Sequence, residues 1–230
     1  MQLENITNRS KSETKRTYED ACGLAHALDL IGERWAMLVL RELAYGPRRF
    51  SGLKRDLRGI SANVLTQRLN ELEARGLVRR ARLPPPASVQ VYEATDWGLE
   101  AIPMIARLGR WAARSPLHDP TLQMSHVSVI MSLQTLIVPE RAIEFEGRVG
   151  FRFGEADYVT TVREGALDVE RAEPKNVAVT FIGDPTAVAG VIHGGAPFET
   201  IGVEGDLDLA RRFIGLFQLP DKVEAALALA

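Results

Sequence analysis

The sequence predicts two domains, a mostly helical domain that carries a β-hairpin and an α+β domain with an antiparallel sheet. The 230 residues are enough for two cores of roughly 100 residues each. Residues 1–114 hold 19 basic and 13 acidic side chains, whereas residues 115–230 hold 9 and 17, so the net charges are +6 and −8. Seven of the eight phenylalanines lie in the second half. A basic half joined to an acidic half is typical of a nucleic-acid module tethered to a domain that does not contact nucleic acid.

Changes in composition divide the chain into four segments. Residues 1–17 are polar, lack the apolar centre of a signal peptide and are predicted to be a disordered arm. Residues 18–115 form the first domain, residues 116–123 (PLHDPTLQ) a linker with two prolines, and residues 124–230 the second domain. A single cysteine excludes an intrachain disulfide, and no apolar stretch is long enough to span a bilayer. We therefore expect a cytoplasmic protein.

The second helix of a predicted helix pair carries the strongest signal in the first domain. Ser61 is a good N-cap, residues 62–75 contain no Pro or Gly, and Gly76 stands where a left-handed C-terminal residue is expected. Leu65, Leu69 and Leu72 form an apolar stripe, and four short hydrogen-bonding side chains lie opposite: Asn63, Thr66, Gln67 and Asn70. Asn and Gln can pair with adenine edges, and Thr can contact a base edge or a thymine methyl. Taken alone, this helix supports base reading and a plain polar surface about equally.

The flanking segments favour the reading of DNA. Before this helix, a first helix carries Leu53 and Leu57 with Lys54 beside them, and a tight turn follows at residues 58–60. After it, residues 77–82 and 89–92 are expected to form two strands around a proline-rich tip. This order is that of a winged helix-turn-helix, which places the strand arginines against phosphates; a solvated hairpin is the alternative. The predicted DNA-binding residues are Lys54, Ser61, Asn63, Thr66, Gln67, Asn70, Arg79, Arg80 and Arg82.

The stretch from Cys22 to Trp111 resembles the HxlR family of winged-helix transcriptional regulators. The resemblance rests on motifs in order: residues 22–28 (CGLAHAL), 31–35 (IGERW), 40–43 (LREL), 46–50 (GPRRF), 59–61 (GIS), 64–69 (VLTQRL) and 72–78 (LEARGLV), with Val91-Tyr92, Thr95 and Gly98. It implies a homodimer with one recognition helix per half-site and an interface built by the N-terminal helix and the helix over residues 96–114. The residues support this interface independently, because the latter helix has a broader apolar face than one small domain can bury: Ile102, Ile105, Leu108 and Trp111. Pro103 should kink this helix or delay its start.

Cys22 has two interpretations. In the family that the first domain resembles, a cysteine near this position can sense oxidants or electrophiles through its thiolate. Here it stands alone, so reversible sensing would need an interchain disulfide or a small-molecule adduct. No Lys or Arg is adjacent to Cys22, and Asp20 would raise its pKa, if anything. The alternative is a small residue buried in the core.

The second domain is predicted to be an antiparallel sheet with helices on one face. A first hairpin is expected to turn at Gly147-Arg148. The expected strands are residues 142–146, 149–153, 158–162, 166–169, 177–182 and 200–203. The expected helices are residues 124–138, 185–192 (stopped by Gly194-Gly195), 207–217 and 222–230.

This half resembles the sterol carrier protein-type lipid-binding domain over residues 125–217. The resemblance is carried by residues 149–153 (VGFRF), 165–167 (GAL), 180–185 (TFIGDP), 192–195 (IHGG) and 203–207 (VEGDL). It implies an apolar tunnel between sheet and helices for a fatty or sterol-like ligand. Core packing is the alternative role of each candidate lining residue: Phe151, Phe153, Tyr158, Phe181, His193 and Phe213. Joined to a DNA reader, such a fold would sense an apolar ligand or only help the chain to dimerise.

No catalytic arrangement is recognisable in the sequence. The four histidines are scattered and none forms a metal pattern with a carboxylate: His26, His118, His126 and His193. Gly194-Gly195 lacks a phosphate-binding context, and no serine lies in a GxSxG motif. We therefore expect no cofactor, no metal and no enzymatic activity. The alternative to regulation is a lipid- or small-molecule-binding protein in which the winged helix mainly dimerises.

Overall fold

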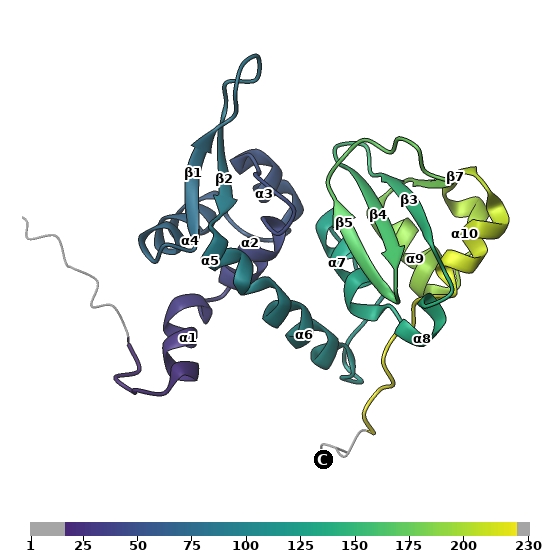
Figure 1. Cartoon of the computed structure of the whole chain (residues 1–230). Helices are drawn as coiled ribbons and strands as arrows, with labels where there is room; N and C mark the ends of the chain where they lie inside the picture. The colour runs from purple at the N-terminus through teal and green to yellow at the C-terminus, as the bar shows by residue number, and fades with distance from the viewer. Residues whose placement is uncertain (1–16, 225–230) are drawn as a thin grey trace, which may run out of the picture.

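The computed structural model describes residues 17–224, which fold into two units (Figure 1). The arm predicted over residues 1–17 lies outside the described residues except for Thr17. Within the described range, no helix is long and apolar enough to cross a membrane. The first unit contains α1 (Gly23–Ile31), α2 (Ala36–Glu42), α3 (Phe50–Asp56), α4 (Ala62–Ala74), β1 (Val78–Arg82), β2 (Gln90–Ala94), α5 (Asp96–Glu100) and α6 (Ile102–Ala113).

Leucine packing holds the helix-turn-helix together. Side chains from α2, α3, the turn that follows it and α4 are buried against one another: Leu40, Leu53, Leu57, Leu65, Leu69 and Leu72. Burying each such side chain stabilises the fold by about 1.5–3 kcal/mol. The turn passes through Gly59, whose φ of 85° lies in the left-handed region that favours glycine. The predicted α4 is confirmed, because Ser61 Oγ accepts from the N–H of Val64 at 3.2 Å and the helix ends at Ala74.

The wing, β1 and β2, is fixed to the start of α3. The two strands pair antiparallel, with Arg80 opposite Tyr92. Tyr92 also pairs with Arg48, in the loop before α3, through N–H to C=O hydrogen bonds of 2.8 Å in both directions. The position of the wing therefore follows that of the residues that lead into α3.

The helix predicted over residues 96–114 is two helices. α5 begins at Asp96, after the N-cap Thr95, whose side chain accepts from the N–H of Gly98 at 3.0 Å, and α6 begins at Ile102. Pro103 lies in the first turn of α6, where a missing N–H costs least, and it cannot extend α5 because it has no N–H to bond to the carbonyl of Leu99. The delayed start predicted from Pro103 is confirmed, and the single continuous helix was wrong.

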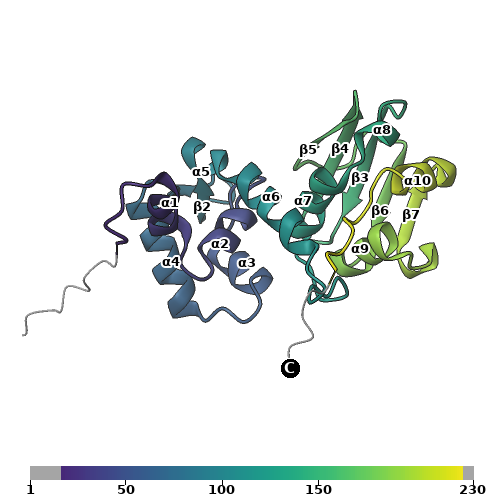
Figure 2. The same cartoon turned by 90° about the horizontal axis from the view of Figure 1, so that it is seen from below.

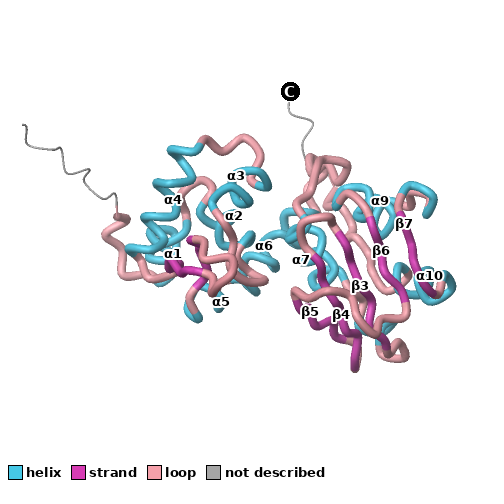
Figure 3. Tube along the Cα trace, turned by 90° about the horizontal axis from the view of Figure 1, so that it is seen from above, coloured by secondary structure: helices cyan, strands magenta, loops and turns pink. Residues whose placement is uncertain are grey.

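The second unit is an α+β structure in which helices cover one face of a five-stranded sheet (Figures 1 and 2). The strands are β3 (Gly147–Arg152), β4 (Asp157–Arg163), β5 (Ala166–Glu170), β6 (Val179–Ile182) and β7 (Gly202–Gly205), in the order β5-β4-β3-β6-β7. The helices are α7 (His126–Leu136), α8 (Pro139–Ala142), α9 (Pro185–Gly194), the short 3-10 helix η1 (Phe198–Thr200) and α10 (Leu207–Ile214). α6 and α7 contact each other where the two units join (Figure 3).

The sheet is mixed, so the prediction of an antiparallel sheet was wrong at one pair of strands. β3 and β6 run parallel, with Val149 opposite Val179, whereas the other pairs are antiparallel. Residues 171–178 cross the sheet between β5 and β6 instead of forming a hairpin. Pro174 lies so close to Gly150 that a Cβ there would come within 2.6 Å of it. Because the connection crosses the sheet, β6 pairs with the free edge of β3 and runs parallel to it.

One further element prediction was wrong, and another falls mostly outside the described residues. Residues 142–146 are not a strand, because α8 ends at Ala142 and the next strand begins at Gly147. Ala142 and Phe145 are both buried at a spacing of three, which fits a helical turn and not the alternation of a strand. Residues 222–224 are not helical, and residues 225–230 lie outside the described residues.

Candidate nucleic-acid interface

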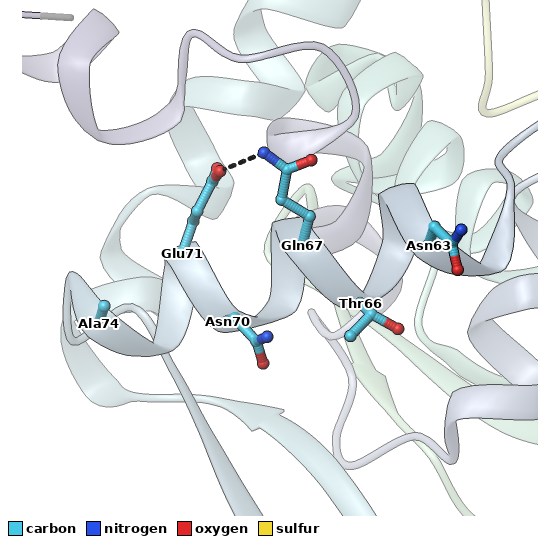
Figure 4. Close-up of a pocket in the computed structure, with 6 residues that line it drawn as sticks. All are labelled: Asn63, Thr66, Gln67, Asn70, Glu71 and Ala74. Carbon is cyan, nitrogen blue, oxygen red and sulfur yellow. Dashed lines mark hydrogen bonds between the residues drawn. The ribbon is translucent and has the colours of Figure 1, made fainter. Parts of the chain in front are cut away.

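The exposed face of α4 lines a shallow hollow of about 550 Å³. All four residues predicted to read bases line this hollow, together with Glu71 and Ala74 (Figure 4): Asn63, Thr66, Gln67 and Asn70. They share one face because they recur at helical spacing, and the three leucines of α4 pack on the opposite side. The structure therefore brings the predicted reading residues together on one surface, here called the reading face.

Local hydrogen bonds hold three of these side chains in place. Thr66 Oγ1 donates to a backbone carbonyl of α4 at 2.9 Å, and Gln67 Nε2 donates to Glu71 Oε1 at 2.9 Å (Figure 4). Asn70 Oδ1 accepts from the Arg80 guanidinium at 2.6 Å. All three bonds are exposed, so a base edge or a phosphate can replace each partner without leaving a buried group unsatisfied.

Sequence reasoning missed two charged residues of α4. Glu71 places a carboxylate on the reading face, where it can accept from the exocyclic amine of a cytosine. Arg68 is buried on the adjoining face, forms an ion pair with Glu71 and lies 3.5 Å from Glu33. The spacing of three between Arg68 and Glu71 is the one signal in the sequence that could have found this pair.

The wing arginines differ in what they contact. Arg79 is 67% exposed and its Nε lies 2.7 Å from Glu93, whereas Arg80 lies 3.2 Å from Glu73 and so leans toward α4. Arg82 is exposed and forms no ion pair within the described range. Exposed ion pairs contribute only about 0–1 kcal/mol. Phosphates can therefore compete with Glu73 and Glu93 for these arginines, whereas Arg82 has no such competitor among residues 17–224.

α3 and the start of α4 carry the other two predicted residues. Lys54 lies in α3 and is half-buried. The Ser61 oxygen is used as the N-cap of α4, and its O–H can still donate to a phosphate at this helix terminus.

Cys22 is exposed, so its interpretation as a buried core residue was wrong. It is the N-cap residue of α1, and the N–H groups of Ala25 and Leu24 lower the pKa of its thiol. The expectation that Asp20 raises this pKa was wrong as well. Asp20 instead accepts a hydrogen bond of 2.9 Å from the backbone N–H of Cys22.

The phenylalanines predicted to line an apolar cavity pack against one another. The rings of Phe151 and Phe181 stack with their centroids 5.4 Å apart, and Phe213 lies 6.0 Å from Phe181. Phe153 stacks on Phe151 at 5.9 Å. These rings fill the space between sheet and helices, which favours core packing as their role.

The two polar candidates for that cavity have partners inside the second unit. The hydroxyl of Tyr158 lies 2.7 Å from Nδ1 of His126. Nε2 of His193 lies 2.8 Å from the hydroxyl of Ser132, which itself donates to a backbone carbonyl, so the histidine is the donor. Burial lowers the pKa of His193 to about 4, and its Nδ1 has no partner among the described residues.

Comparison with known proteins matches the first unit. A family model described as HxlR-like helix-turn-helix matches residues 30–118. The uncharacterized HTH-type transcriptional regulator YvaP of Bacillus subtilis (strain 168) is 35% identical over 86 residues, which are 37% of this chain and 80% of YvaP. YkvN of the same strain, named likewise, is 38% identical over 94 residues, which are 40% of this chain and 77% of YkvN. Among solved structures, the reduced form of the transcriptional regulator YodB from B. subtilis is 29% identical, covers 44% of this chain and 100% of its own, and has a TM-score of 0.38.

The fold and the reading face define a winged helix-turn-helix protein. The chain belongs to the HxlR-like helix-turn-helix family, whose similar members are named transcriptional regulators. The family model ends at residue 118, before α7 and the five-stranded sheet. The second unit lies outside the part of the chain that the family model matches.

Proposed function

We propose that this chain is a transcriptional regulator that binds DNA as a homodimer, with α4 in the major groove and the wing over the flanking phosphates. The observation that carries the proposal is the reading face, where exposed hydrogen-bonding side chains lie beside the wing arginines. The leucine core beneath α4 supports it, because a recognition helix has to be held rigidly to read bases.

The homodimer is supported by α6. None of its twelve residues is buried, although one side of the helix is apolar, with Met104, Leu108 and Trp111 between 46% and 69% exposed. α1 also exposes Leu24 and Leu28, and both helices lie on the side of the first unit away from the wing tip (Figure 1). A second copy related by a twofold axis would cover this surface.

Fluorescence anisotropy on duplexes from the region upstream of its own gene tests DNA binding. We expect tighter binding to one such duplex than to random DNA at physiological salt, and a steep loss of affinity as salt rises, because bound arginines release counterions. Equal affinity for every duplex would contradict the proposal.

Size-exclusion chromatography with light scattering tests whether the protein is a dimer. The wild type should have twice the mass of one chain, and Trp111→Glu should shift it toward the monomer because it places a charge in the apolar interface. Leu207→Glu is the matched control, since Leu207 is 47% exposed in α10 of the second unit. A wild-type monomer, or the same shift in both variants, would contradict an interface at α6.

The finer part of the proposal is that the second unit is sterol carrier-like and senses an apolar ligand. The helices that cover one face of its sheet support the sterol carrier-like part of this proposal. A ligand would have to displace the packed rings of Phe151, Phe181 and Phe213. Native mass spectrometry tests this part: a retained apolar molecule that alters DNA affinity supports sensing, and one that leaves it unchanged supports carriage alone.

A further inference from the structure

Charged side chains of the first unit are buried where the second unit contacts it. Glu42, the last residue of α2, is completely buried and accepts a hydrogen bond of 2.7 Å from the hydroxyl of Ser125. Arg48, which is 5% exposed, lies 3.5 Å from Glu42 and also forms an ion pair with Asp56 at the end of α3. Buried charges are tolerated only when they are paired in this way, so the arrangement is sensitive to the loss of any one partner.

His126, the first residue of α7, links this cluster to the core of the second unit. Its Nε2 lies 3.3 Å from Asp56 Oδ2, and its Nδ1 lies 2.7 Å from the hydroxyl of Tyr158 in β4. Burial raises the pKa of Tyr158, so this hydroxyl keeps its proton and can donate to Nδ1. In the tautomer that carries its proton on Nε2, the ring accepts from the tyrosine hydroxyl and directs its N–H at Asp56, so one tautomer satisfies both partners. The imidazole ring also stacks on Phe153.

Asp56 is contacted by residues of both units. Burial alone would raise the pKa of its carboxyl, but hydrogen bonds from His126, Arg55 and Arg48 outweigh burial and hold the pKa well below its usual range. Asp56 therefore stays ionised and holds its donors in place. It immediately precedes the turn into α4, and Arg48 is paired through its backbone with Tyr92 of the wing.

The surrounding contacts are more exposed than this line of buried groups. Arg55 forms an ion pair with Glu155, and both side chains are largely exposed to solvent. Tyr45 donates to Gln134, and Arg171 donates to the carbonyl of Pro47 at 3.3 Å, both on the exposed side of the junction. Exposed contacts of this kind exchange readily with water, so they position α3 less firmly than His126 does.

We infer that His126 is a positioning residue for DNA binding, through which the second unit holds α3, and with it the turn to α4 and the wing, by contacts from Tyr158 to His126 to Asp56. The inference rests on the proposed function. It makes the second unit part of the DNA-binding structure, and gives any change at Tyr158 a direct path to the reading face.

Three variants and a control test this inference by anisotropy on the tightest-binding duplex. Tyr158→Phe removes only the hydroxyl, and His126→Phe removes both nitrogens while keeping a ring on Phe153. The third variant combines the two. Thr160→Val is the matched control, because it removes a buried hydrogen bond of 3.2 Å to the carbonyl of Val149 from the same strand without contacting the junction.

Tyr158→Phe should weaken binding about three- to tenfold, the range for the loss of one buried hydrogen bond, and His126→Phe should weaken it more. The double variant should bind no more weakly than His126→Phe, because the tyrosine hydroxyl acts only through the histidine. Thr160→Val should bind like the wild type even where it melts at a lower temperature. Binding within twofold of the wild type in both single variants, or an equal loss in Thr160→Val, overturns the inference.

Hydrogen exchange in the free protein keeps the test independent of DNA. Amides of residues 50–57 should exchange faster in Tyr158→Phe and His126→Phe than in the wild type or Thr160→Val. In both variants the contact between His126 and Asp56, which holds α3, is weakened or lost. Unchanged amide exchange in residues 50–57 would show that His126 does not hold α3 in place. If the wild type binds no duplex selectively, the proposed function fails, and the exchange rates still decide whether the second unit holds α3.

Discussion

The reading face and the junction between the units use polar side chains in opposite ways. On the reading face, Gln67 and Asn70 are exposed and bonded to neighbours on the same surface, so DNA can replace those neighbours at little cost. At the junction, Glu42, Arg48 and His126 are buried, and their partners come from different elements and from both units. Exposed polar groups can thus change partners to bind, whereas buried ones keep a fixed arrangement.

The largest effect is expected from Arg48→Met at the junction. It leaves Glu42 and Asp56 with fewer donors in a buried place and should lower the free energy of unfolding by about 3–5 kcal/mol. Urea unfolding followed by tryptophan fluorescence measures this, because all three tryptophans lie in the first unit. The control Arg79→Met removes an exposed ion pair and should cost about 0–1 kcal/mol. If both variants lost the same free energy of unfolding, buried polar contacts would not be more important for stability than exposed ones.

A smaller effect, on binding alone, is expected from Gln67→Ala on the reading face. It should weaken the specific duplex by about 1–3 kcal/mol, relax the base preference at one position and leave urea unfolding unchanged. Anisotropy on single-substitution duplexes measures it.

Arg82→Ala is the control for Gln67→Ala. It should weaken all duplexes alike, because the role we propose for Arg82 is contact with phosphates, which carry no sequence information. Arg80→Ala is a poorer control, since Arg80 also holds Asn70. If Gln67→Ala reduced the affinity for random and specific duplexes equally, the residue would not read a base.

The reading face could be predicted from the sequence because its signals are local. The Ser61 cap, the leucine spacing and Gly76 all lie in α4 or within two residues of its ends, so each acts on neighbours a few residues away. The sterics of Pro103 likewise act on the turn in which it lies, so the late start of α6 was predictable.

The junction could not be predicted, because Asp56 and His126 are seventy residues apart and belong to different units. No periodicity or cap links them, and each residue alone fits a helix end. The parallel pairing of β3 with β6 could not be predicted from the sequence for the same reason, because it depends on how residues 171–178 cross the sheet. The strand predicted over residues 142–146 was wrong for a different reason. A segment of five residues that is rich in apolar side chains fits both a strand and a helical turn.

Acidification should affect a half-buried polar group outside the junction, His193 in α9. Its pKa of about 4 lies below the ordinary value of 6.5, so the unfolded chain takes up a proton at a higher pH than the folded one. This contribution to stability is complete above pH 6.5 and is lost as pH falls toward 4. Calorimetry should therefore show a smaller decrease in melting temperature over this range for His193→Gln than for the wild type. His26→Gln, an exposed control in α1, should follow the wild type; a parallel decrease in all three would exclude His193 as the cause.

The smallest effect is expected from Lys222→Met, which tests an exposed contact that joins distant segments. The Lys222 ammonium donates to the carbonyls of Ala113, Ser115 and His118 at 3.0, 3.0 and 3.1 Å, at the C-terminal end of α6. A cation at this end of a helix contributes about 0.3–1 kcal/mol, so exchange should quicken in the last turn of α6 while urea unfolding hardly changes. Lys175→Met, which loses only the surface pair with Glu173, is the control and should leave exchange in α6 unaltered. If Lys222→Met destabilised the protein as much as Arg48→Met, burial would not be what separates the fixed polar contacts from the exchangeable ones, because Lys222 is exposed.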